Sequence, residues 1–299
     1  MNVAVLYTCF NRKEKTLSSL KGLFSSQDAY NVKATSPIEL AVFLTDDGCT
    51  DGTADAIRET FSSKKITILK GNGNLYWAGG MRTSWNEALK YHEKWDFYLL
   101  LNDDTILQDN AFEELMNTHR YCLGKYYREG IYSGITCAHD NTSHITYGGD
   151  VVLNNLTGKR KRLSISDTPQ MCDFTNANIM LVPKSIVDAI GILYSGYKHS
   201  AADFDYTYKA RSLGYPVLVT ANACGYCDFD HESQESMRDK IISMSLRERK
   251  KFLSSPLHSG LDHLTLVKRT TPLKYPVALL FRYLKIYCPQ MYYWINRRR

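Results

Sequence analysis

The sequence predicts an α/β protein in which a mostly parallel central sheet is flanked by helices. In residues 97–107, the apolar run Phe-Tyr-Leu-Leu-Leu ends abruptly in Asn102-Asp103-Asp104, and short unbroken apolar runs are typical of strands buried on both faces. Further short apolar runs alternate with segments of helical spacing, which indicates strands joined by helices. Open α/β sheets bind ligands just beyond the carboxyl ends of their strands, although an Asx turn would also explain these polar residues.

The composition is that of a folded protein whose charge is unevenly spread. The 299 residues are enough for one large domain or two smaller ones, and a hydrophobic fraction of 44% supplies an ample core. From residue 237 onward, 14 Lys and Arg stand against 3 Asp and Glu, a net charge of +11, whereas the remainder carries −5. The basic tail is therefore expected to meet an anionic lipid, a nucleic acid or a phosphorylated acceptor.

The eight cysteines predict reduced thiols in a cytosolic protein, because the N-terminus reads as a strand and not as a signal peptide. Cys224-Gly-Tyr-Cys227 is the one close pair. A redox pair would be expected at the start of a helix, and a zinc site would need ligands beyond His231. Both alternatives stay open, while buried thiols that pack as small hydrophobic groups are favoured.

Three units of strand, polar loop and helix are expected in the first 91 residues. The strands are predicted at residues 3–7, 38–44 and 66–70. The helices are predicted at residues 13–24, 54–61 and 81–91. In the first helix, Leu17, Leu20 and Leu23 recur at the spacing of one helical face.

The loops after these strands carry polar residues that could serve a nucleotide. The first loop holds Thr8, Asn11 and Arg12, which suit a base, a ribose or a phosphate, although a polar turn before a helix would look the same. The second loop places Asp46 and Asp47 at the tip of a buried strand. Helix capping explains the later residues of this loop but does not require two further acids at its start.

A pair of glycines precedes the third predicted helix. Gly79-Gly80 could bring phosphate oxygens close to free N–H groups, and Arg82 could add a charge-assisted contact. The same two glycines would also serve a tight turn.

The next part of the chain continues with strands and helices. Strands are predicted at residues 130–137, 147–153, 172–182 and 217–220. Helices are predicted at residues 112–119, 184–190 and 203–211. Residues 155–167 read as a polar loop, whose basic run Lys159-Arg-Lys-Arg162 is a solvated turn or a contact to an acceptor or diphosphate. Asp203 and Asp205 stand at a helix start, where the macrodipole favours anions, but a general base facing a cleft would need the same position.

Five motifs then occur in a characteristic order. They are Tyr7-Thr-Cys-Phe-Asn-Arg12, Thr45-Asp-Asp-Gly-Cys-Thr-Asp-Gly-Thr53, Asn74-Leu-Tyr-Trp-Ala-Gly-Gly80, Leu100-Leu-Asn-Asp-Asp-Thr105 and Asp203-Phe-Asp-Tyr-Thr-Tyr-Lys209. Together they resemble the family 2 inverting glycosyltransferases of the GT-A fold, especially the rhamnosyltransferase-like branch of bacterial polysaccharide synthesis. The resemblance implies a Rossmann-like GT-A catalytic domain at residues 1–235, followed by a basic, helical C-terminal extension at residues 236–299.

The resemblance also implies an activity and its site. A sugar would pass from dTDP-rhamnose or a UDP-hexose to a hydroxyl of a growing bacterial surface glycan, such as a capsule or O-antigen, with inversion and with Mn²⁺ or Mg²⁺ as the cofactor. Asp203 would be the general base, and Asp104 and His231 the metal ligands. The nucleotide-diphosphate-sugar donor would be bound by Thr8, Asn11, Arg12, Asp46, Asp47, Trp77, Gly79, Gly80, Arg82, Asn102 and Asp103.

Three positions depart from the family pattern. Asn102 replaces the first Asp, which removes one charge from the metal site, and Ala202 precedes Asp203 where an acid is common. Lys209 stands where an Arg is usual and lacks its bidentate geometry. A non-catalytic relative that binds a nucleotide sugar or a glycan is therefore the alternative to an enzyme.

Residues 273–299 predict a helix at a membrane surface. Residues 273–287 have an apolar body with Arg282 and Lys285 on one narrow face, too short and charged for a bilayer span of about 20 apolar residues. Packing on the catalytic domain or in a homo-oligomer is an equal alternative. A cytoplasmic enzyme, peripheral at the inner face of the cell membrane, would meet a lipid-linked glycan acceptor there. Nucleic-acid binding is not expected, because no such module is recognisable.

Overall fold

One large β-sheet forms the centre of the computed structural model, which describes residues 1–154, 159–228, 233–258 and 260–296. Its strands lie in the order β10-β13-β6-β12-β4-β1-β2-β3, while β5 pairs with β13 and β7 with β6. The bounds of these strands are β1 (Asn2–Cys9), β2 (Glu39–Asp46), β3 (Ile66–Lys70), β4 (Phe97–Leu101), β5 (Ile106–Leu107), β6 (Ile131–Cys137), β7 (Ile145–Tyr147), β10 (Gln170–Met171), β12 (Ile179–Pro183) and β13 (Val217–Tyr226).

Most of the long strands of this sheet share one direction. The strands β3, β2, β1 and β4 are parallel to one another, and so are β6 and β13. Since β12 runs antiparallel to both of its neighbours, β4 and β6, the two parallel groups point the same way. The short strands β5, β7 and β10 are antiparallel additions. The predicted mostly parallel sheet is confirmed.

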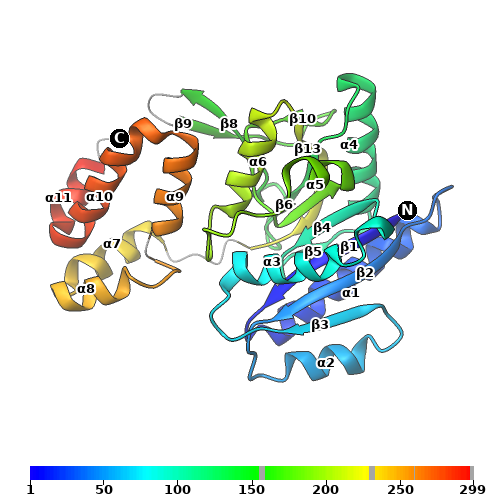
Figure 1. Cartoon of the computed structure of the whole chain (residues 1–299), viewed down its shortest axis with the longest axis horizontal. Coiled ribbons are helices and arrows are strands. Elements are labelled where there is room, and N and C mark those ends of the chain that lie inside the picture. Colours follow the sequence, from blue (N-terminus) through cyan, green and yellow to red (C-terminus); the bar gives the residue numbers. More distant parts are fainter. Residues whose placement is uncertain (155–158, 229–232, 259, 297–299) are drawn as a thin grey trace.

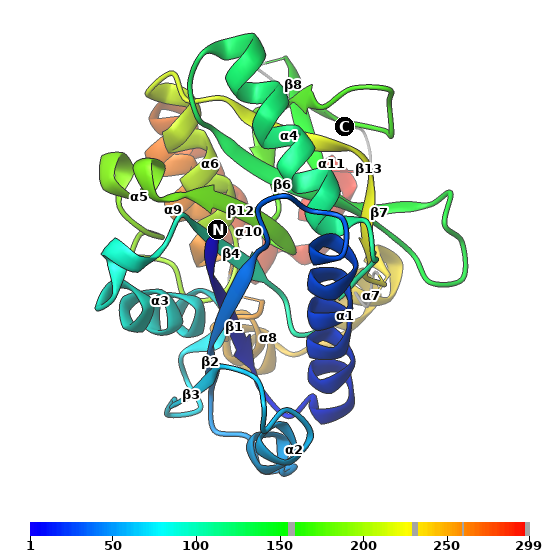
Figure 2. The same cartoon turned by 90° about the vertical axis from the view of Figure 1, so that its right-hand side faces the viewer.

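Helices cover both faces of the sheet (Figures 1 and 2). They are α1 (Lys13–Asn31), α2 (Thr53–Thr60), α3 (Tyr76–Leu89), α4 (Ala111–Tyr126), α5 (Lys184–Ile190) and α6 (Ala202–Ser212), with a 3₁₀ turn η1 (His92–Lys94). Along β1, Val3, Val5 and Tyr7 belong to the core packed against α1, α2 and α4, whereas Ala4 and Leu6 belong to the core packed against α3, α5 and α6. This alternation buries both sides of the strand.

The prediction that residues 155–167 form a polar loop is wrong for the basic segment Lys159–Arg162, because this segment forms strand β9. This strand pairs with β8 (Gly149–Asn154), which also pairs with β11 (Phe174–Thr175), so the three form a second small sheet. The charged side chains have partners there: Arg162 pairs with Asp150, and the Arg160 guanidinium lies 4.0 Å from the Phe174 ring centroid. Tertiary contacts, which no local pattern encodes, stabilise this strand.

Two other strand predictions need correction. Residues 172–182 are not one strand, because the chain passes from β10 in the main sheet to β11 in the small sheet and returns as β12. The last strand, β13, runs on to Tyr226, with register shifts between Val219 and Gly225. Cys224 therefore lies within a strand and not at the start of a helix, so the geometry expected of a redox pair is not formed; Cys224 and Cys227 are both buried.

Five helices follow β13 in the described residues, and they lie beside the α/β part of the chain in Figure 1. We refer to them as the C-terminal extension. They are α7 (Gln234–Ser243), α8 (Leu246–Phe252), α9 (Leu261–Thr270), α10 (Tyr275–Tyr287) and α11 (Pro289–Asn296), with a 3₁₀ turn η2 (Pro272–Lys274). Ile241, Leu253 and Ile286 form a small core, and the buried Arg249 donates hydrogen bonds to the carbonyls of Ile241, Met244 and Ile286. Among the described residues, none of the helices combines the length and the apolar character that a membrane span requires.

Two buried carboxylates join helix α9 of the extension to the α/β part of the chain. The Asp262 carboxylate accepts hydrogen bonds from the backbone N–H groups of residues 198–200, in the loop between α5 and α6. On α6, Asp205 accepts from Arg269 Nε at 2.7 Å, and the Arg269 guanidinium lies over the Tyr194 ring. The extension thus holds the loop that leads into the helix of Asp203.

We predict that Arg269→Gln lowers the free energy of unfolding by about 2–3 kcal/mol, because it leaves the Asp205 carboxylate, whose side chain is 5% exposed, buried without its cation. Arg58→Gln is the matched control, since its partner Asp55 is 88% exposed, and should change stability by about 0–0.5 kcal/mol. Urea unfolding of both variants measures the difference. Equal effects would show that the Asp205 pair does not stabilise the junction.

Candidate active site

The carboxyl ends of the parallel strands bring the predicted site residues to one edge of the sheet. In the β1–β2 ladder Thr8 is opposite Thr45 and Cys9 is opposite Asp46, and β4 pairs with β1 on the other side up to Leu100. The residues that follow each strand therefore meet: the loop of Arg12, the pair Asp46-Asp47 and the Asn102–Asp104 segment. This is the convergence that the sequence predicts for an open α/β sheet.

A buried carboxylate marks the end of β4. Asp103 is 7% exposed, and its burial raises its pKa to about 7, although the Arg12 guanidinium acts in the opposite direction. Arg12 Nη1 lies 2.7 Å from Asp104 Oδ2 and 3.4 Å from Asp103 Oδ1. The guanidinium therefore compensates the negative charge of both acids, which desolvation would otherwise penalise.

The residues around Asp104 fit a hard divalent cation. Carboxylate oxygens are the ligands that Mg²⁺ and Mn²⁺ prefer, and Mg²⁺ commonly uses only one or two of them together with water and substrate phosphates. Among the described residues no three His, Cys, Asp or Glu side chains converge on one point, so Asp104 and Asp103 would form such a partial set. The other predicted ligand, His231, lies outside the described residues.

A cavity of about 190 Å³ beside Asp104 adds residues that the sequence did not single out. His139 and Asp228 line it, and Asp228 accepts a hydrogen bond from the His139 backbone N–H group. Arg12 contacts Asp104 Oδ2, and the Cys227 thiol lies 3.7 Å from the other oxygen of this carboxylate, Asp104 Oδ1. Burial and Asp104 raise the pKa of Cys227 to about 12, so the thiol stays protonated and donates a weak hydrogen bond.

Asn102 is held by groups from two other elements. Its side-chain Oδ1 accepts a hydrogen bond from Trp77 Nε1 at 2.7 Å, and its backbone N–H donates to the Asn178 carbonyl. The predicted donor-binding residue Trp77 thus fixes the amide that replaces the first Asp of the motif. The sequence analysis did not predict a role for Asn178. The polar residues Asn176 and Asn178, which lie between β11 and β12, were a signal that the chain is not one continuous strand there.

Asp47 caps helix α3 from a distant loop. Its carboxylate, 4% exposed, accepts hydrogen bonds from the backbone N–H groups of Gly73, Leu75 and Tyr76. These groups would otherwise lack partners at the helix start. Both oxygens of Asp47 are occupied by these hydrogen bonds. The prediction that Asp46 or Asp47 contacts the nucleotide base therefore depends on Asp46, which is half-buried and accepts a hydrogen bond from the Cys49 N–H group.

The first loop is shaped by Asn11. This residue adopts the left-handed backbone conformation, with a φ of 50°, and its Oδ1 accepts from the Thr50 backbone N–H group at 2.7 Å. The contact ties the loop after β1 to the loop after β2. Thr8 is 8% exposed, and its side chain lies beside Gly80 of α3.

The expectation that Gly79 and Gly80 precede the helix is wrong, because α3 begins at Tyr76. The Gly79 N–H already donates to the Leu75 carbonyl, so the pair does not offer free N–H groups to a phosphate. The role of Gly80 is close packing. A Cβ at this position would lie 2.0 Å from Thr8 Oγ1, which means that only glycine lets α3 approach β1 so closely.

Asp203 lies in the first turn of α6, as predicted. Its two oxygens accept hydrogen bonds from the backbone N–H groups of Phe204 and Ala177, at 2.9 and 3.2 Å. Burial nevertheless raises its pKa to about 6. Ala177 is adjacent to Asn178, whose carbonyl holds Asn102, so one short segment connects the predicted base with the acidic end of β4.

Two basic residues have backbone partners. Arg82 Nη1 donates to the Tyr194 carbonyl, and burial lowers its pKa. Lys209 Nζ donates to the Ile190 carbonyl, the last residue of α5, where a cation interacts favourably with the helix dipole. Lys209 thus contacts the C-terminal end of α5, and Arg82 helps to hold the loop before α6.

Comparison with solved structures identifies the architecture. The mannosyltransferase PcManGT from Pyrobaculum calidifontis, in complex with GDP-Man and Mn²⁺, matches with a TM-score of 0.54 and 13% identity, over 97% of this chain and 71% of that one. Residues 1–349 of S. aureus TarS in complex with UDP-GlcNAc match with a TM-score of 0.55 and 12% identity, over 95% and 73%. The fold is GT-A-like. At these identities the likeness establishes the fold and not the activity.

Further comparisons set the limits of this likeness. S. aureus TarS 1–349 in complex with UDP matches with a TM-score of 0.51 and 16% identity, over 81% of this chain, which spans 63% of the length of that one. Comparison with protein-family models and with curated protein sequences gives no match.

We predict that Gly80→Ala destabilises the fold by about 3 kcal/mol or more, because its Cβ would overlap the buried Thr8 side chain. The control is Gly124→Ala in α4, where a Cβ meets no atom within 4 Å and should stabilise the helix by about 0.5–1 kcal/mol. Thermal unfolding by circular dichroism compares the two. If Gly80→Ala melts at the wild-type temperature, the close packing of α3 on β1 is incorrect.

Proposed function

We propose that this chain is an inverting glycosyltransferase that uses a nucleotide-diphosphate-sugar donor. The observation that carries the proposal is the pairing of an acidic strand end, Asp103-Asp104, with a carboxylate of raised pKa, Asp203, across the segment of Ala177 and Asn178. Carboxylates in different environments suit different roles. Here Asp103 and Asp104 would bind a cation, and Asp203 would take part in proton transfer. The GT-A-like neighbours, which bind UDP, UDP-GlcNAc or GDP-Man, support this reading.

The donor would bind at the carboxyl edge of the sheet. Asp46, Asn11 and the loop of Thr8 would contact the nucleoside, and Arg12 would exchange its carboxylate partners for the diphosphate through charge-assisted hydrogen bonds. Asp104 and Asp103 would hold Mn²⁺ or Mg²⁺, with His231 as a further ligand; such a cation, when bound, offsets the charge that develops on the leaving diphosphate. The neighbour crystallised with Mn²⁺ supports this choice of cofactor.

Asp203 would act as the general base toward the acceptor hydroxyl. A pKa of about 6 leaves the carboxylate mostly ionised at neutral pH and keeps it basic enough to take a proton as the new bond forms. Attack from the face opposite the leaving group gives inversion in one displacement. The acceptor would be a hydroxyl of a growing bacterial surface glycan, and dTDP-rhamnose and UDP-hexoses are the donors to test first.

We predict that Asp203→Asn lowers kcat for sugar transfer by about 10²–10⁴-fold, because the base is lost, while donor binding and folding persist. The amide oxygen can still accept from one of the backbone N–H groups that Asp203 binds. Asp55→Asn, an exposed acid in the first turn of α2, is the matched control and should leave the rate unchanged. Release of nucleoside diphosphate from UDP-, dTDP- and GDP-sugars measures transfer.

The pH profile checks the same assignment. Because the ionised carboxylate is the active form, kcat/KM of the wild type should show a rise with pH that is centred at about 6. The residual rate of Asp203→Asn should lack this rise. Wild-type transfer by Asp203→Asn would contradict the role of Asp203, and donor binding without transfer by the wild type would favour the non-catalytic alternative.

A further inference from the structure

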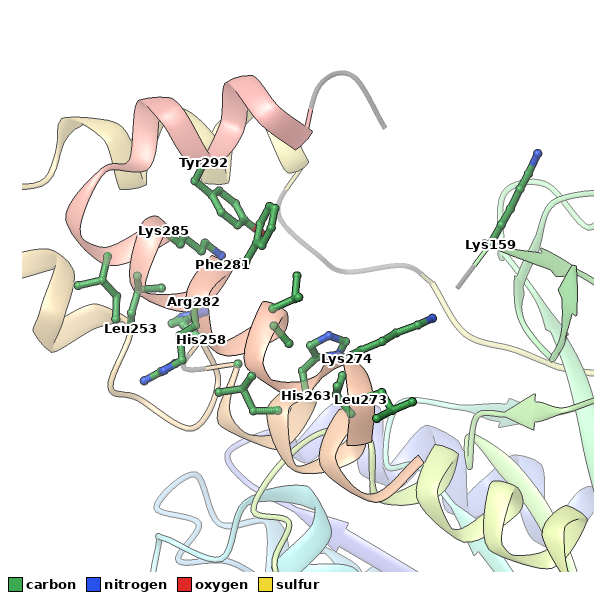
Figure 3. A pocket seen from close by; sticks show the side chains of 16 residues that line it. Lys159, Leu253, His258, His263, Leu273, Lys274, Phe281, Arg282, Lys285 and Tyr292 are labelled. Atoms are coloured by element: carbon green, nitrogen blue, oxygen red, sulfur yellow. The ribbon is translucent and has the colours of Figure 1, made fainter. Parts of the chain in front are cut away.

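A large cavity among the described residues lies in the extension, away from the sheet edge. Its volume is about 1090 Å³, and it lies among α9, α10, α11 and the segment after α8. Figure 3 shows the labelled side chains of the extension grouped around it, whereas Lys159 of β9 lies apart from them. Neither the proposed donor site nor the proposed base uses any of these residues.

The lining of this cavity combines apolar and cationic side chains. Its apolar part comes from α9 and α10, as at Val267, Ala278 and Phe281. Its basic residues are Lys159, His258, His263, Lys274, Arg282 and Lys285. The described residues that line the cavity include no Asp or Glu. An amphiphile with an acidic head group is the ligand that such a lining complements.

Two of the cations repel each other within the cavity. Arg282 and Lys285 are three residues apart on α10, both half-buried, and no carboxylate of the described residues is paired with either. Burial lowers the pKa of Lys285, and the neighbouring Arg282 lowers it further. Burial also lowers the pKa of Arg282. A bound phosphate would offset this desolvation and like-charge repulsion.

An exposed apolar face runs from the 3₁₀ turn η2, which contains Leu273, onto α10. Leu273, Val277, Leu280, Tyr283 and Tyr287 recur at helical spacing, and Leu273 is 95% exposed while Leu280 is 63% exposed. The face continues on α11 with Met291 and Trp294, each more than half exposed. Leu273 and Val277 also line the cavity, so the apolar face and the basic interior are continuous. Such a combination is typical of a helix at a membrane interface.

We propose that this cavity binds the phosphate head group of an anionic membrane lipid, while the apolar face of α10 and α11 lies in the bilayer interface. Arg282 and Lys285 bind the phosphate, and the apolar wall contacts the first part of the hydrocarbon chain. The volume exceeds that of a phosphate alone and matches the upper range of small-ligand pockets, about 300–1,000 Å³. This inference does not depend on the proposed glycosyl transfer, although it would bring the catalytic edge to membrane-bound acceptors.

Vesicle flotation of the full-length chain tests the proposal. We expect binding to phosphatidylcholine vesicles that contain phosphatidylglycerol and little binding to pure phosphatidylcholine. Arg282→Gln/Lys285→Gln should weaken this binding at least tenfold, since each juxtamembrane cation contributes about 1 kcal/mol. Arg247→Gln/Lys251→Gln is the matched control, because it removes the same two charges from exposed positions of α8 outside the cavity.

The apolar face has its own matched pair. Leu280→Ser should weaken vesicle binding, whereas Leu213→Ser, a 54% exposed leucine at the end of α6, should not. Circular dichroism melting confirms that each variant is folded. Because the proposed ligand is the phosphate of the lipid head group, inorganic phosphate at millimolar concentration should displace the protein from the vesicles.

Four results would overturn the proposal. Equal weakening by the two double variants would mean generic surface charge, and equal binding to both kinds of vesicle would mean no head-group recognition. Binding of a generic RNA that depends on Arg282 and Lys285, without vesicle binding, would assign the cations to nucleic acid. A dimer that Leu280→Ser dissociates, again without vesicle binding, would assign the apolar face to a second copy of this chain.

Discussion

The negative charge at the carboxyl end of β4 is the constraint on which the rest of the site depends. Asp103 is almost fully buried, and its carboxylate is tolerated because Arg12 approaches it from the loop that leaves β1. Because β1 and β4 are adjacent parallel strands that end at the same edge, this loop can reach the end of β4. Two adjacent carboxylates favour a bound divalent cation or a basic group, because either one offsets their negative charge. A cation at this place would in turn bind a diphosphate, which is why we propose a donor that carries one.

Three further carboxylates order the loops around this edge by one physical device. Asp47, Asp203 and Asp262 each accept backbone N–H groups from a segment distant in sequence or from a helix start. Backbone donors that would otherwise lack partners are satisfied, and each contact fixes a loop in place. Asp262 belongs to the extension, which therefore takes part in forming the loop before α6. The extension consequently has two faces, one that contacts the α/β part of the chain and one that is basic and apolar.

Much of this arrangement could be predicted from sequence where the signals are local. The apolar run before Asn102 indicates a buried strand, and the helical spacing after Asp203 indicates a helix start. The start of α3 could not be predicted, because its N–H groups are capped by Asp47, which lies in another loop. Strand β9 is stabilised by Asp150 and Phe174, and the extension is joined through Asp205. Each of these depends on long-range contacts that a periodicity does not contain.

The most direct test of the central claim is calorimetric titration of the wild type and Asp104→Asn with UDP, dTDP and GDP, each with Mn²⁺ and again with EDTA. We expect one nucleoside diphosphate to bind the wild type, with an affinity that falls sharply in EDTA and in Asp104→Asn. Binding that is indifferent to both Mn²⁺ and Asp104 would keep a nucleotide pocket but remove the metal site. Failure of every nucleotide to bind would contradict the proposed donor site itself.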